Sequence, residues 1–75
     1  MSTLRLIATF ATTMAAITME RACREEGLPG RIIPVPRSIS ASCGMAWYAS
    51  PEDRGVLEEM TGRRRIQVEG WYYIS

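Results

Sequence analysis

The sequence contains no histidine and only two cysteines, Cys23 and Cys43, among its 75 residues. Without histidine, a catalytic triad or an acid–base pair built on imidazole is excluded. A zinc site with four ligands would need carboxylates in unusual number, so we expect neither a metal nor any other cofactor. Two thiols are also too few for the disulfide framework of a small secreted domain, and they favour a reduced, cytoplasmic protein.

Lysine is absent as well: the nine basic residues are all arginine, and eight acidic residues leave a net charge of +1. This balance gives no general nucleic-acid footprint, so we expect no nucleic-acid partner. The uncharged stretch 6–19 imitates a signal peptide, but threonines interrupt it and no small-x-small cleavage site follows. It is shorter than the roughly 20 apolar residues that span a bilayer. We therefore take it as part of the fold and expect no membrane association.

Alternation of apolar and polar residues predicts strands over 3–10, 30–35, 44–49 and 64–74. In the last of these, Ile66, Val68 and Gly70 share one face of the strand. Pro34 cannot donate to a ladder, so the second strand is predicted at a sheet edge.

Two helices are predicted between these strands. The first begins at Thr12 or Thr13 and ends before Gly27. Its apolar stripe consists of Ala15, Ala16, Met19, Ala22 and Cys23. The second opens at Ser50 and Pro51 and ends at Gly62. Its apolar face consists of Val56, Leu57 and Met60.

The order strand–helix–strand–strand–helix–strand predicts an α+β, ferredoxin-like βαββαβ sandwich in which residues 1–75 form one domain. Both helices would cover one face of a four-stranded antiparallel sheet. In this topology the loop 36–43, the start of the first helix and the start of the last strand lie at one end of the sheet. We therefore expect Cys43, Arg37, Thr12 and Thr13 to gather there, with residues 63–65 nearby.

Residues 34–44 read Pro-Val-Pro-Arg-Ser-Ile-Ser-Ala-Ser-Cys-Gly and place a thiol at the end of a polar loop. The thiolate is the reactive form of cysteine, and a nearby cation such as Arg37 or a helix N-terminus favours it. Gly44 permits a positive φ or the close approach of a partner. The alternative is a half-buried thiol that ends a loop, with serines that are common in turns.

The motif Pro34-Val-Pro36-Arg37, followed by Ile39-Ser40-x-Ser42-Cys43-Gly44, resembles the signature of the selenium/sulfur carrier protein-like family of small bacterial domains. Gly27, the Pro-Glu-Asp sequence at 51–53 and Glu69-Gly70 extend the resemblance over nearly the whole chain. Trp47-Tyr48 depart from the family pattern, which has an aliphatic and then a basic residue there.

The resemblance implies a carrier or adaptor, without turnover of its own, that holds sulfur or selenium on Cys43 as a persulfide or selenide. Its partners would be a desulfurase-like donor and a selenophosphate-forming acceptor. The groups expected to stabilise the charged outer atom are Arg37, Ser38, Ser40, Ser42, Gly44, Thr12 and Thr13.

Two other functions stay open. A non-catalytic module could dock or form a homodimer through aromatic residues of the sheet, with Cys43 incidental, or Cys43 could act as a redox sensor through an intermolecular disulfide. The aromatic residues in question are Trp47, Tyr48, Trp71, Tyr72 and Tyr73. We expect half of these rings to pack under the helices and the rest to cover an interface between two copies.

Cys23 is expected in the core. It lies ~15 Å along the first helix from that helix's start, too far from Cys43 for a disulfide. Arg63, Arg64 and Arg65 are interpreted as a solvated turn near a helix C-terminus, with an anion site as the alternative.

Overall fold

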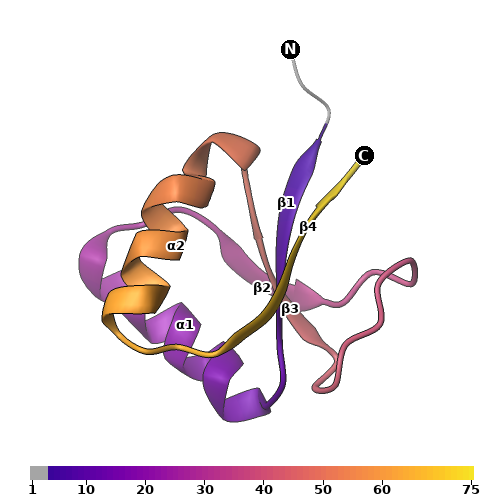
Figure 1. The fold of residues 1–75 in the computed structure, drawn as a ribbon, viewed down its shortest axis with the longest axis horizontal. Helices are drawn as coiled ribbons and strands as arrows, with labels where there is room; N and C mark the ends of the chain where they lie inside the picture. Colours follow the sequence, from indigo (N-terminus) through magenta and orange to yellow (C-terminus); the bar gives the residue numbers. More distant parts are fainter. Residues whose placement is uncertain (1–3) are drawn as a thin grey trace.

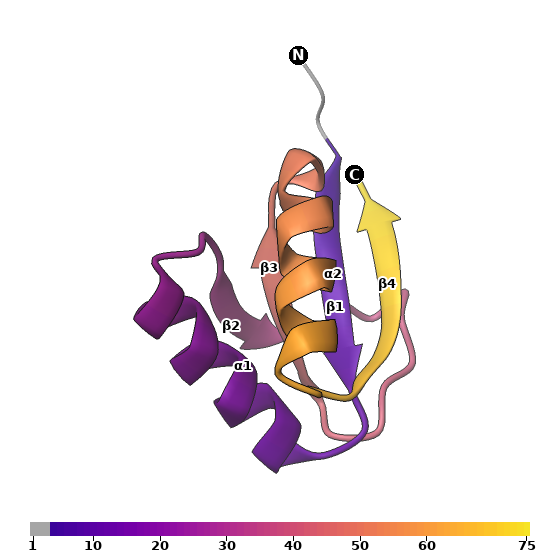
Figure 2. The ribbon, with the colours of Figure 1, turned by 60° about the vertical axis from the view of Figure 1, so that its left-hand side comes forward.

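The computed structural model describes residues 4–75 and contains one sheet and two helices (Figure 1). Its elements are β1 (Arg5–Phe10), α1 (Thr13–Glu26), β2 (Arg31–Pro34), β3 (Met45–Ala49), the 3₁₀ turn η1 (Pro51–Asp53), α2 (Arg54–Arg63) and β4 (Val68–Ile74). The strand order is β2-β3-β1-β4, and neighbouring strands are antiparallel. Both helices cover one face of the sheet (Figure 2). The predicted ferredoxin-like α+β fold and the edge position of β2 are confirmed; residue 3, where the first strand was predicted to begin, lies outside the described residues.

Helix α1 begins and ends where the sequence predicts. The Thr12 hydroxyl oxygen accepts a hydrogen bond from the Ala15 amide at 3.1 Å, which satisfies one of the free amides of the first turn. Gly27 ends the helix with a φ of 67°, and the Leu28 amide reaches back to the Cys23 carbonyl at 2.8 Å. This left-handed C-cap favours glycine because it has no Cβ.

Helix α2 differs from the prediction at both ends. Pro51 to Asp53 form a 3₁₀ turn before the α-helix starts, and the Ser50 side chain makes no capping bond. Gly62 lies inside the helix, and Arg65 takes the left-handed conformation instead, with a φ of 58°. The Ile66 amide then bonds to the Thr61 carbonyl at 2.9 Å, which buries the Ile66 side chain against the core. The stop is therefore set by an apolar contact after the helix and not by a glycine.

The main core lies between the sheet and the helices. Leu6 and Phe10 of β1 meet Met19 of α1 and Leu57 of α2 there, all fully buried. Trp47 of β3 joins them, and its indole nitrogen donates to the Pro29 carbonyl at 3.2 Å.

A β-bulge interrupts the pairing of β1 with β4. Thr9 is opposite Gly70, but Phe10 is opposite Val68, so Glu69 is an extra residue on β4. Because one inserted residue reverses the alternation, Val68 lies on the helix side and Gly70 on the open side of the sheet. The prediction that Val68 and Gly70 share a face is wrong for this reason.

The bulge also sorts the aromatic residues of β4. Trp71 and Tyr73 are opposite Ala8 and Leu6, whose side chains lie in the helix-side core. Tyr72 is opposite Ile7, which belongs to a second cluster on the other face. The rings therefore divide between the two faces of the sheet.

The connection between β2 and β3 lies on the side of the sheet opposite the helices (Figure 1). Ile39, in its middle, is 8% exposed and packs with Ile7 and Ala46. Val35 packs against the same cluster. This loop is thus held to the sheet by apolar contacts.

Candidate functional site

Two backbone hydrogen bonds shape the loop 35–44. The Ile39 amide donates to the Pro36 carbonyl at 3.0 Å, which makes a tight turn with Arg37 and Ser38 at its tip. The Val35 amide donates to the Gly44 carbonyl at 3.0 Å and ties the two ends of the loop together. Cys43 therefore lies at the closed base of the loop, and Arg37 lies at its exposed tip.

The Cys43 side chain is half-buried and packs against the helix-side core. Its Sγ donates to the Met45 carbonyl oxygen at 3.5 Å. Ile39 belongs to the cluster on the opposite face, so the loop passes round the end of the sheet between these two residues. Gly44, with a φ of 75°, makes the reversal into β3. The thiol lies at the edge of the core, and both of its neighbours in the chain, Ser42 and Gly44, are exposed to solvent.

Glu69 fixes the residue immediately before the thiol. Its Oε2 accepts a hydrogen bond from the Ser42 hydroxyl at 2.9 Å, and its Oε1 accepts one from the Ser42 amide at 3.4 Å. Glu69 is the bulged residue of β4, and bulges commonly re-aim a side chain beside a functional site. Sequence reasoning did not include Glu69 in the site, although Glu69-Gly70 is part of the family resemblance.

The expected gathering of elements is present. The 35–44 loop, the start of α1 and the start of β4 lie at the same end of the sheet (Figure 2). Thr12 there uses its hydroxyl oxygen as the cap of α1, and Thr13 is exposed in the first turn.

Individual contacts to the thiol are fewer than the sequence suggests. Within residues 4–75, no hydrogen bond joins Cys43 to Arg37, Thr12 or Thr13. Ser38 and Ser40 are exposed. The loop thus holds Cys43 in one place and leaves most of its polar side chains in solvent.

A model of the family described as "Putative Se/S carrier protein-like" matches residues 5–73. The chain belongs to this family. The match includes the whole Cys43 loop, Glu69 and every helix and strand apart from Ile74, the last residue of β4. No curated protein and no solved structure matches the chain.

Cys23, the second thiol of this family member, has a different environment. It is 1% exposed on α1, and burial together with the Glu26 charge raises its pKa to about 11. Cys23 therefore stays protonated near neutral pH, which makes it a poor nucleophile. Both cysteines are free, and Cys43 is the more accessible of the two.

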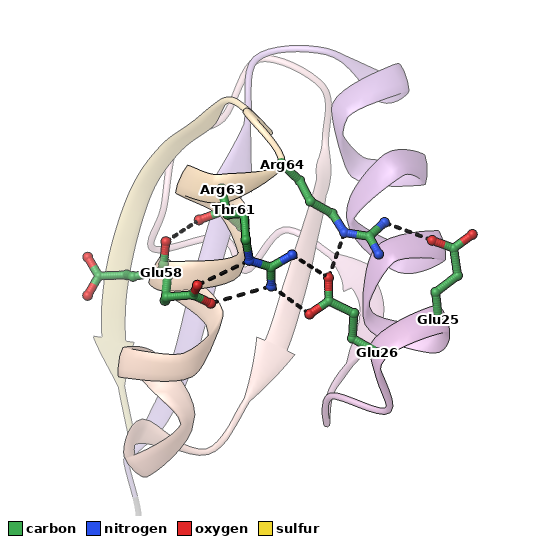
Figure 3. Close-up of polar contacts among 7 residues, drawn as sticks. Glu25, Glu26, Glu58, Thr61, Arg63 and Arg64 are labelled. Carbon is green, nitrogen blue, oxygen red and sulfur yellow. Dashed lines mark hydrogen bonds and ion pairs between the residues drawn. The ribbon is translucent and has the colours of Figure 1, made fainter.

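Arg63 and Arg64 bind carboxylates of α1 and α2 (Figure 3). Arg63 donates to both oxygens of Glu26 at 3.0 and 2.7 Å, and its Nε reaches Glu59 at 3.1 Å. Arg64 donates to Glu26 at 2.6 Å and to Glu25 at 2.7 Å. These hydrogen bonds, first those from Arg63 and then that from Arg64, lower the pKa of Glu26 to about 2. The two arginines thus bridge the helices in place of the solvated turn expected there, and their guanidinium groups are occupied.

Among the described residues, 4–75, no three side chains of His, Cys, Asp or Glu lie close enough together to hold a metal ion. Over the same residues, neither helix has the length and apolar character needed to cross a membrane.

Proposed function

We propose that the protein carries sulfur or selenium on Cys43 between a donor protein and an acceptor protein in the bacterial cytoplasm. The family match supports the class of cargo. The observation that points to Cys43 is the contrast between the two thiols: Cys23 is sealed in the core, whereas Cys43 is half-buried at the end of the sheet.

Loading needs no added oxidant. The Cys43 thiolate attacks the outer sulfur of a persulfide on the donor, the donor's S–S bond breaks, and the donor leaves as its thiolate. A new S–S bond then joins Cys43 to the transferred atom, and a selenium atom would follow the same course. A desulfurase-like enzyme has the chemistry of such a donor, and a selenophosphate-forming enzyme that of such an acceptor.

The loop supplies groups for the charged outer atom. That atom would stand about 2 Å beyond Sγ, as in any S–S bond. Arg37, Ser38 and Ser40 are exposed and offer a cation and two hydroxyls from the same loop. Thr13 contributes from the start of α1, where the helix dipole favours negative charge. Gly44 has no side chain, so the chain next to Cys43 is open to a partner, and its φ of 75° favours glycine at this position.

Intact-mass spectrometry after incubation with a cysteine desulfurase and cysteine tests the proposal. We expect an increase of about 32 mass units, or about 80 with a selenium donor, on the wild type and on Cys23→Ser. Cys43→Ser should gain nothing. An unchanged wild type, or equal labelling of Cys43→Ser, would contradict the carrier role.

One observation favours a second function. The Cys43 Sγ donates to the Met45 carbonyl and packs on the core, which is how a structural thiol behaves. The protein would then be an interaction module. In that case Cys43→Ala should lower the free energy of unfolding by about 1 kcal/mol or more, and no adduct should form on the wild type. Light scattering on wild type and Tyr72→Ala would show whether a homodimer depends on the sheet.

A further inference from the structure

Four side chains form one row across the open face of the sheet, one from each strand. Arg31 of β2 is opposite Tyr48 of β3, Tyr48 is opposite Ile7 of β1, and Ile7 is opposite Tyr72 of β4. Arg5 and Ile74 form the neighbouring pair on the same face. Ile7 itself is 0% exposed and packs against Ile39 of the 35–44 loop, so the accessible part of the row consists of Arg31, Tyr48 and Tyr72, with Arg5 beside them. We propose that these side chains form a docking surface for an acidic segment of a partner protein.

Two guanidinium groups lie on one ring of the row. Arg5 and Arg31 stand 6.0 and 5.2 Å from the centre of the Tyr48 ring. Within residues 4–75 neither has a carboxylate partner, whereas Arg24, Arg54, Arg63 and Arg64 all form ion pairs. Two positive charges thus border one ring without an ion-pair partner among the described residues, and an incoming carboxylate would supply that partner.

No acidic side chain belongs to the row itself. All acidic side chains except Glu69 belong to α1, η1 or α2. Two of these, Asp53 and Glu20, line surface pockets together with Arg31 at the β2 edge, but neither forms an ion pair with it among residues 4–75. Glu69 is engaged by Ser42 at the opposite end of β4 from Ile74. The row and the neighbouring Arg5–Ile74 pair therefore carry two positive side chains and no negative one, although the whole chain is nearly neutral, and this favours an acidic partner.

The charges and rings of the row favour an acidic peptide over a second copy of the chain or a nucleic acid. A second copy docked sheet to sheet would place its own Arg5 and Arg31 against the same pair, which like-charge repulsion opposes. A nucleic acid would need several open rings on which successive bases stack, but the row offers Tyr72 alone, because two guanidinium groups lie on Tyr48. An acidic peptide fits the charge and the shape of this surface. Each guanidinium group can donate two hydrogen bonds to one carboxylate of the peptide, and Tyr72, which is 38% exposed, offers an apolar contact.

The docking surface adjoins the Cys43 loop. Ile39 and Val35 of that loop share an apolar cluster with Ile7 and Tyr48 of the row. A partner seated on the row would therefore contact the loop as well. The docking surface itself does not depend on what Cys43 carries.

Fluorescence anisotropy with a labelled ten-residue peptide of alternating Glu and Ala tests this surface at low ionic strength. We expect saturable binding that weakens as salt is added, because the contacts are ionic. Arg5→Gln combined with Arg31→Gln should weaken it about tenfold. The matched control is Arg21→Gln combined with Arg65→Gln, which removes the same charge elsewhere and should leave binding unchanged. Circular dichroism verifies that both double variants are folded.

Amide chemical-shift changes should concentrate on Arg31, Tyr48 and Tyr72. The proposal is overturned if the acidic peptide does not bind, if a Gln-Ala peptide binds equally, or if both double variants lose affinity to the same extent. Tighter binding of a ten-nucleotide oligouridine through Arg5 and Arg31 would identify a nucleic-acid surface instead. A dimer that dissociates when these two arginines are replaced would identify a second copy as the occupant.

Discussion

Glu69 holds Ser42 through both carboxylate oxygens, with the hydroxyl at 2.9 Å and the amide at 3.4 Å. Ser42 immediately precedes Cys43, so a bulged residue of the last strand restrains the backbone of the candidate carrier thiol. No contact within the loop itself replaces this restraint on Ser42 among the described residues. We therefore expect the Glu69–Ser42 contact to limit how far Cys43 can move away from the core, together with the Val35–Gly44 backbone hydrogen bond and the Cys43 hydrogen bond to Met45.

Removing the Glu69 side chain should release the thiol. We expect Glu69→Ala to raise the rate at which iodoacetamide alkylates Cys43 about fivefold at pH 7.5, because local opening of the loop loses about 1 kcal/mol of opposing hydrogen bonds. Ser42→Ala, which keeps the amide contact, should have a smaller effect. The rates are measured by mass spectrometry in a Cys23→Ser background.

Two controls sharpen this experiment. Glu52→Ala removes an exposed carboxylate far from the loop and should leave the rate unchanged. Glu69→Gln keeps an acceptor for the Ser42 hydroxyl, so it should fall between wild type and Glu69→Ala. A rate in Glu69→Ala that equals or falls below that of wild type would show that the contact does not restrain Cys43.

Arg65 is a second target, because it occupies a left-handed position that suits glycine. Its φ of 58° resembles that of Gly27 at the end of α1, 67°. We expect Arg65→Gly to increase the free energy of unfolding by about 1 kcal/mol, measured by urea denaturation. Arg65→Ala keeps the strained φ and should bring no gain. Destabilisation by Arg65→Gly would mean that the Arg65 side chain outweighs the backbone strain.

The sequence predicts the elements that depend on local patterns. Helix α1 is set by Thr12, Gly27 and a continuous apolar stripe, and all three lie within one segment. The Glu69 bulge could not be predicted, because it depends on the register between β4 and β1, which no periodicity within β4 reveals. The left-handed turn at Arg65, after the end of α2, was missed because it depends on the burial of Ile66.

The candidate site also has parts that the sequence predicts and parts that it does not. Cys43, Gly44 and the serines could be singled out because they are adjacent in the chain. The Glu69–Ser42 contact could not be predicted, because its partners are 27 positions apart in the chain. The burial of Ile39 was also missed, since a single apolar residue in a polar loop carries no periodic signal.

Glu26 should make stability sensitive to acid. Its pKa falls from 4.5 to about 2 in the folded protein, first through the Arg63 hydrogen bonds. The stabilisation from its charge is therefore present above pH 4.5 and is lost as the pH falls toward about 2. We expect the melting temperature of Glu26→Gln to fall less than that of wild type over this interval. Glu52→Gln serves as the control, and parallel curves for wild type and Glu26→Gln would contradict the interhelix bridge.

Cys23 should make stability sensitive to alkali. Burial raises its pKa from 9.0 to about 11, so the unfolded chain loses the thiol proton first as the pH rises. Stability attributable to Cys23 is thus complete below pH 9.0 and declines up to about pH 11. Urea denaturation should show a loss of about 2 kcal/mol over this interval in wild type that Cys23→Ala lacks. Identical pH profiles would place Cys23 in contact with water.

The transfer of one sulfur atom per chain tests the central claim most directly. Protein loaded by a desulfurase is separated from the donor and treated with cyanide, which removes the outer sulfur as thiocyanate and regenerates the Cys43 thiolate. We expect about one thiocyanate per chain from the wild type and from Cys23→Ser, and none from Cys43→Ser. Thiocyanate from Cys43→Ser in the wild-type amount, or none from the wild type, would contradict a carrier role for Cys43.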